Sequence, residues 1–215
     1  MMLKKEREVA YLIEKYLDNI RDWQKITSEA VLSYFMDDPE GLKLAVLSKN
    51  QFQTAAERNR QHIWKKLCDG AYLPVIRGSL FSITTDASRI ANSATVCCET
   101  FYFQQPRISH KLGTEFSSIT QGTFNLFKPV YNSILQYLRG MDVVKTISQN
   151  IEVFWKQKTE VILLEDELKH QIYASSLDPW QKTQLNMCAQ SITAVSNQIS
   201  EMEDRVQLII AKLVF

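Results

Sequence analysis

Glycine and proline are scarce in this sequence, with six glycines and five prolines among 215 residues. They cluster at a few apparent breaks, and the stretches between them are rich in leucine, lysine, glutamate, glutamine and alanine, which all favour helix. No stretch alternates between apolar and polar residues as a half-buried strand would. This composition excludes a glycine-rich phosphate-binding loop, and it predicts an all-α protein built from long helices.

The sequence also lacks the marks of a disulfide-rich, membrane-spanning or nucleic-acid-binding protein. Its four cysteines form no CxxC pair and no zinc spacing, so we expect reduced thiols in a cytoplasmic protein. Glutamates interrupt the first apolar segment and no later apolar run reaches membrane length, so neither a signal peptide nor a spanning helix is expected. The formal net charge is +1 with both signs interspersed, which argues against nucleic acid as a partner.

Motifs for catalysis are missing as well. His62, His110 and His170 lie on separate predicted segments without a second histidine at the spacing of a helical zinc site, so we expect them on the surface. Neither a GxSxG nucleophile motif nor a dinucleotide fingerprint occurs. A di-iron helical enzyme would need Glu-x-x-His motifs on two helices, which the sequence does not provide. We therefore predict that the protein is not an enzyme.

Two apolar ladders lie 105 residues apart and match position by position. In each ladder apolar residues alternate at spacings of three and four, which keeps one stripe of an α-helix apolar. The same shift superposes Pro74 on Pro179 and Asn92 on Asn197, so helix-start and polar positions repeat along with the apolar ones. This pattern indicates an internal duplication. The ladders consist of Leu80, Ile83, Ala87, Ile90, Ala94, Cys97 and Phe101, and of Leu185, Cys188, Ile192, Val195, Ile199, Met202 and Val206.

Six long helices are expected, three in each repeat. Short connections make neighbouring helices antiparallel, so each repeat should be a three-helix bundle. We predict repeats at residues 1–105 and 106–215, packed as one helical domain in an up-down bundle. The helices are expected at about residues 3–36, 38–66, 74–103, 109–139 with a kink near Pro129, 141–175, and 178–212 with Asp178 as its cap.

Several side chains have two interpretations at this stage. Lys158 and Glu165 fall on the apolar stripe of the fifth helix, where they either reach solvent or form an interhelical ion pair. The second helix is expected to pack through Leu44, Leu47, Phe52, Ala55, Asn59 and Ile63. The four tryptophans are interpreted as core or groove anchors: Trp23, Trp64, Trp155 and Trp180.

Polar residues share one face of the third helix and one face of the sixth, opposite the ladders. Steps of four and seven align them, so their oxygens could converge with carboxylates of a neighbouring helix. A solvated outer face is the alternative interpretation. These residues are Ser88, Asn92 and Glu99 in one repeat, and Thr193, Asn197, Glu201 and Asp204 in the other.

The segment LCDGAYLPVIRGSLFSITTDASRIANSA, followed by QQPRI, resembles the PhoU-like phosphate-transport accessory proteins. The resemblance is to the branch encoded beside low-affinity Pit-type phosphate transporters. That branch carries Leu-Glu-x-Glu-Ala-Asp on its second helix, a Leu-Pro-x-x-Arg turn, and Asp-x-Ile-Ala-Asp on its third helix. The counterparts here are Phe52–Glu57, Leu73–Arg77 and Ser88–Asn92, with Leu164–Glu167, Val195–Asn197 and Glu203–Val206 in the second half.

The resemblance implies two three-helix repeats. It also implies metal clusters held by carboxylates, since many family members have them. Several of those carboxylates are neutral side chains here and one is a lysine, and neutral oxygens offset less of a cation's dehydration. We therefore expect no cofactor beyond a weakly bound divalent or iron-type metal. The positions carried over are Gln53 with Glu57, Ser88 with Asn92, Glu99, Glu165 with Lys169, and Asn197 with Glu201 and Asp204.

The function implied is that of a cytoplasmic, non-enzymatic regulator of phosphate transport. It would bind a protein partner, either a phosphate transporter or its regulator, and would reach the membrane only through that partner. A homodimer formed through Phe101, Tyr102 and Phe103 is also considered. The alternatives are a helical adaptor that has lost its metal and phosphate roles, and a metal-cluster-binding helical protein.

Overall fold

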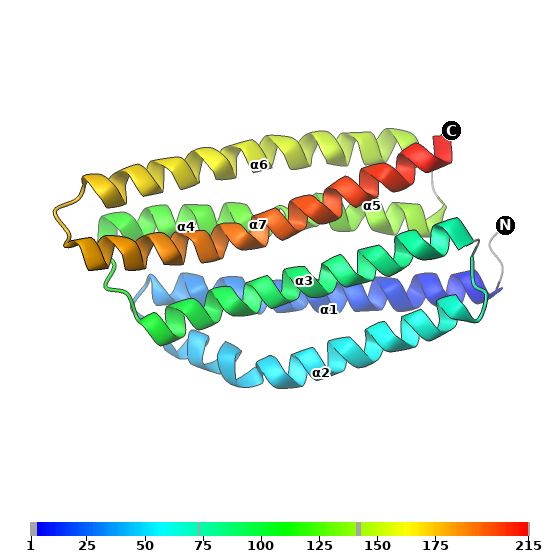
Figure 1. The fold of residues 1–215 in the computed structure, drawn as a ribbon, viewed down its shortest axis with the longest axis horizontal. Helices are drawn as coiled ribbons and strands as arrows, with labels where there is room; N and C mark the ends of the chain where they lie inside the picture. Colours follow the sequence, from blue (N-terminus) through cyan, green and yellow to red (C-terminus); the bar gives the residue numbers. More distant parts are fainter. Residues whose placement is uncertain (1–3, 73, 141–142, 215) are drawn as a thin grey trace.

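A computed structural model describes residues 4–72, 74–140 and 143–214. Across these ranges the chain is helical, with no strand, and the helices form an elongated bundle (Figure 1). Leu73 of the turn motif, and residues 3 and 141–142 of two predicted helices, lie outside the described residues. The helices are α1 (Lys4–Tyr34), α2 (Glu40–Cys68), α3 (Pro74–Gln104), α4 (His110–Asn125), α5 (Phe127–Arg139), α6 (Val143–Ala174) and α7 (Pro179–Val214).

The predicted fourth helix is divided into α4 and α5 at Leu126. Pro129 explains the break, because its nitrogen has no hydrogen to donate to the carbonyl of Asn125 and its ring crowds that carbonyl. Leu126 itself is fully buried, so the break is packed into the core. The predicted kink is therefore confirmed, one turn before the proline.

Local sequence also explains the other helix ends. The Ser109 side chain accepts a hydrogen bond from the amide of Leu112 at 3.4 Å, and Asp178 accepts one from the amide of Gln181 at 3.0 Å. Gly70 and Gly140 follow α2 and α5 with φ of +93° and +62°, a conformation that glycine adopts without strain. The predicted boundary after residue 105 lies in the connection between α3 and α4.

α3 and α7 lie side by side and antiparallel through the middle of the bundle (Figure 1). The Gln184 side chain donates to the carbonyl of Gln104 at 2.8 Å near one end, and Arg205 pairs with Asp86 toward the other. α1 and α2 pack on α3, whereas α6 and the α4–α5 pair pack on α7. No helix in the described ranges combines the length and apolarity needed to cross a membrane.

Both predicted ladders are buried. All fourteen ladder side chains are at most 3% exposed, and they occupy the faces of α3 and α7 that meet other helices. Because the same positions are buried in both helices, the burial pattern repeats with the 105-residue shift of the sequence. The ladder prediction is confirmed.

The predicted packing face of α2 is wrong except at Phe52 and Ile63, since Ala55 and Asn59 are also exposed. Leu44 and Leu47 are 61% and 68% exposed. The inward stripe instead contains Lys49 and Arg60, whose charged groups reach the edge of the helix and form ion pairs, so the apolar pattern alone selects the wrong face. The buried apolar residues of α2 are Leu42, Ala45, Ala56, Ile63 and Leu67.

Aromatic residues give two further corrections. Phe101 is fully buried against Tyr34, Phe35 and Phe116, so it is unavailable for the dimer face proposed from sequence, whereas Phe103 is 70% exposed. Two of the tryptophans also differ from prediction, since Trp155 is 44% exposed and Trp180 74%. By contrast, Trp23 is buried, stacks on Phe52 and donates to Thr95, and Trp64 is partly buried.

Replacing Ile90 by aspartate is expected to destabilise the fold by several kcal/mol, on the order of 3–5, because it places an unpaired carboxylate in the buried ladder. Val96→Asp is a matched control on the same helix, at a site that is 46% exposed. Urea unfolding followed by circular dichroism measures both. Equal midpoints for Ile90→Asp and the wild type would refute the ladder as the core.

Candidate functional site

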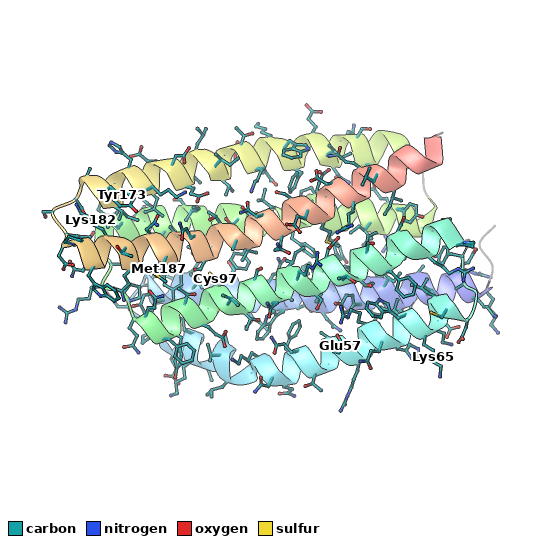
Figure 2. All side chains as sticks on the ribbon, viewed as in Figure 1. Glu57, Lys65, Cys97, Tyr173, Lys182 and Met187 are labelled. Carbon is teal, nitrogen blue, oxygen red and sulfur yellow. The ribbon has the colours of Figure 1, made fainter. Side chains whose placement is uncertain are left out.

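A groove of about 640 Å³ runs between α2 and α3. Four predicted ligand positions line it, because spacings of four place each pair on one face of its helix: Gln53 with Glu57 on α2, and Ser88 with Asn92 on α3. Glu57 projects from α2 (Figure 2). The other lining residues are Ile20, Phe52, Ala56, Arg60, Thr85, Arg89, Ala91, Ser93 and Gln198. The four positions therefore line the same groove, and their role as ligands stays a prediction.

The charges in this groove are already paired. An Nη atom of Arg60 lies 2.6 Å from Oε2 of Glu57, and the same guanidinium stacks on Trp64 at 4.6 Å from the ring centre. The indole nitrogen of Trp64 donates to Thr84, which fixes the ring on which Arg60 rests. Arg89, the second guanidinium at the groove, lies 3.5 Å from Asp86. The groove therefore presents hydroxyl and amide groups between two cations, with Glu57 neutralised.

Glu99 is not part of this groove. It forms an ion pair with Lys49 across α2 and α3, and both side chains are partly buried. The sequence prediction of Glu99 as a ligand position is therefore replaced by a structural role, in which the pair links the two helices away from the groove.

In the second repeat, Lys158 occupies the face where ligands were expected. Its side chain is 8% exposed, and its ammonium donates to Ser196 Oγ at 2.8 Å and to Asn197 Oδ1 at 3.0 Å. Burial lowers the pKa of Lys158, and the nearby charge of Glu165 opposes that effect. Neither interpretation made from sequence holds, because Lys158 is buried and bonds to neutral groups.

The remaining second-repeat positions do not converge. Glu165 pairs with Lys169 at 2.6 Å and accepts a hydrogen bond from Thr193 at 3.2 Å. Asn197, Glu201 and Asp204 are exposed. The solvated-face interpretation therefore fits much of α7.

The residues present do not fit the carboxylate metal cluster that the resemblance implies. In the first repeat Glu57 is neutralised by Arg60, and in the second repeat the oxygens of Ser196 and Asn197 are bonded to an ammonium. Within the described ranges, no three or more histidine, cysteine, aspartate or glutamate side chains are grouped as metal ligands would be. We derive no step that uses a metal.

Two buried acids were not predicted as functional from the sequence. Asp86 on α3 is 2% exposed and contacts Arg205 of α7 as well as Arg89; burial raises its pKa and both arginines oppose the shift. Glu203 is also 2% exposed, and burial raises its pKa to about 7 although Gln207 donates to it at 2.6 Å. The sequence gives only a weak indication of these two buried acids, which is that each directly adjoins a ladder residue.

The histidines are exposed, as predicted, and lie on three different helices. The sequence does contain one Glu-x-x-His motif, Glu167 and His170 on α6, but both side chains are exposed and Glu167 accepts a hydrogen bond from Gln171. A second such motif, which a di-iron centre would need, is absent from the sequence.

Comparison with known proteins is consistent with this architecture. No protein-family model matches the chain. It is 19% identical to a UPF0111 protein of Thermotoga maritima over 97% of its length and 96% of that protein, and 20% identical to a UPF0111 protein of Pyrococcus horikoshii over 97% of both.

Two crystal structures from Shewanella oneidensis share the fold. One, a PhoU-like protein, has a TM-score of 0.80 at 18% identity and covers 94% of this chain and 99% of its own. The other, a PhoU-like protein whose name gives it a proposed role in phosphate regulation, has a TM-score of 0.79 at 17% identity and covers 95% and 99%. These likenesses confirm the fold that the sequence resemblance implies.

Stability should depend on the ionisation of Glu203. Its native pKa of about 7 exceeds the ordinary 4.5, so the native state retains a proton that the unfolded state releases, and stability falls as pH rises from about 4.5 to 7. Glu203→Gln should remove this cost. Its free energy of unfolding should exceed that of the wild type by up to about 3 kcal/mol at pH 8, and the two should differ little at pH 4.5. Urea unfolding at both pH values measures it.

The exposed neighbour Glu201→Gln is the control for the loss of one carboxylate from the same helix. If the stability difference between wild type and Glu203→Gln were the same at pH 4.5 and pH 8, the buried acid would not be the cause.

Proposed function

We propose that this chain, which has the PhoU-like fold, is a non-enzymatic regulator of phosphate transport that acts by binding a protein partner. The observation that carries the proposal is the match of nearly the whole chain to PhoU-like structures at TM-scores of 0.79 and 0.80. The partner is a phosphate transporter or a protein that regulates one, and binding takes place in the cytoplasm. Regulation through binding requires that the partner's conformations bind this chain with different affinities.

The α2–α3 groove supports a role in binding rather than catalysis. Its two guanidinium groups are held by Glu57 and Asp86, and its other polar groups are hydroxyls and amides. The groove lacks both a histidine and a cysteine. The groups that line it can hydrogen-bond a ligand or peptide, and Glu57, the one carboxylate among the lining residues, is paired with Arg60.

The partner surface is proposed at one end of the bundle. The α1–α2 turn, the end of α3 and the start of α7 meet there (Figure 1), and Tyr173 and Met187 lie at the same end (Figure 2). Large apolar side chains exposed by 61–74% belong to these segments, and exposed apolar surface of this kind is typical of interaction sites. We call them the apolar end: Met36, Leu44, Leu47, Phe103 and Trp180.

An adaptor without any phosphate role is the second candidate. Its support is the loss of carboxylates at the positions that the resemblance assigns to metal, together with the paired charges described above. Both candidates require a partner surface. Only the first requires that phosphate transport change when the protein is removed.

Phosphate uptake in a strain that lacks the gene tests the proposal. We expect deletion to change the uptake rate and the wild-type gene to restore it. Trp180→Glu should fail to restore it, because a charge at the centre of an apolar contact weakens binding by at least about tenfold. Leu163→Glu is the matched control, since Leu163 is 63% exposed but lies along α6.

Unchanged uptake in the deletion strain would favour the adaptor and contradict the proposed role. If both glutamate variants restored uptake equally well, the role could stand but the apolar end would not be its partner surface.

A further inference from the structure

Among the basic side chains whose placement the structure describes, Lys158 alone is buried. A buried charge is normally paired with an opposite charge. Here the described residues place no carboxylate oxygen within 4.0 Å of the Lys158 ammonium, which bonds to the neutral oxygens of Ser196 and Asn197. The arrangement is therefore a buried cation coordinated by side-chain oxygens of the adjacent helix.

The two repeats differ at this position. The 105-residue shift that superposes the ladders also relates Ser196 and Asn197 to Ala91 and Asn92. Ala91 and Asn92 line the open groove of the first repeat, whereas Ser196 and Asn197 are engaged by Lys158. The groove between α2 and α3 is thus open, whereas the corresponding space between α6 and α7 is occupied by the Lys158 side chain.

We propose that the Lys158 ammonium is a tethered cation that takes the place of a bound divalent ion between α6 and α7, so that the second repeat closes without metal. The oxygens that could begin to coordinate a metal are already occupied at 2.8 and 3.0 Å. A cation attached to α6 needs no capture from solution, and its positive charge repels a second cation at the same oxygens.

Lys169 also disfavours a bound metal ion between α6 and α7. It neutralises Glu165, the nearby carboxylate that Thr193 also contacts. Among the other acids of this face, Glu201 and Asp204 are exposed. This inference is independent of the proposed regulatory role.

The test is a charge reversal that should create the site that Lys158 excludes. The double variant Lys158→Glu with Lys169→Glu frees Glu165 and adds two carboxylates. The control is Lys156→Glu with Lys169→Glu, which has the same net charge but changes an exposed lysine on the same helix. Thermal unfolding with increasing Mn²⁺, and calorimetric titration with Mn²⁺, are the measurements.

The melting temperature of the wild type and of the control should not respond to Mn²⁺. That of the Lys158 double variant should rise by roughly 5 °C or more at a hundredfold excess over its dissociation constant. No rise in this variant when folded, an equal rise in the control, or a rise in the wild type would overturn the proposal.

A measurement on the wild type covers the case in which the variant does not fold. Paramagnetic Mn²⁺ broadens the NMR signals of nearby amides, so a metal bound between α6 and α7 would erase those of residues 193–201. We expect these signals to keep the same relative intensity as those of exposed residues elsewhere on α7. Selective broadening at 193–201 would show that Lys158 does not replace a metal.

Discussion

The packing of α3 along α7 is the interaction on which the rest of the structure depends. These two helices carry the repeated ladders, and their fourteen side chains are at most 3% exposed. A fully buried Val, Leu, Ile, Phe or Met side chain contributes about 1.5–3 kcal/mol relative to an exposed one, so the ladders of these two helices are a major source of stability. α1 and α2 pack on one of the two helices, and α4, α5 and α6 on the other. The ion pair of Asp86 with Arg205 joins the same two helices, and its carboxylate is buried.

The two halves of the bundle carry unlike sites. Equivalent positions on α3 and α7 line an open groove in the first repeat and hold the Lys158 ammonium in the second. The difference arises from side chains on α2 and α6, while the ladders that set the helix spacing stay the same. A ligand or partner segment therefore finds room beside α2, and the corresponding space beside α6 is used for internal hydrogen bonds.

Much of the fold follows from the sequence because it rests on regular spacing and local chemistry. The ladders, the Asp178 cap and the break before Pro129 each depend on residues within one helix. The face of α2 could not be obtained that way, since Lys49 places a charged group on its inward stripe and finds its partner, Glu99, only on another helix. The same limit applies to the site. The spacing of Gln53, Glu57, Ser88 and Asn92 places each pair on one helix face, and the pairing of Glu57 with Arg60 is also local to α2, but the bonding of Lys158 to Asn197 depends on the register between two helices.

Native-state hydrogen exchange of the two central helices is the most direct test of this account. If the packing of α3 along α7 joins the repeats into one cooperative unit, the slowest amides of α3 and of α7 should exchange with the same free energy, equal to that of global unfolding. Amides of α7 that exchange at a clearly lower free energy than those of α3, with a separate dependence on denaturant, would show that the repeats open independently and would contradict the central role of that packing.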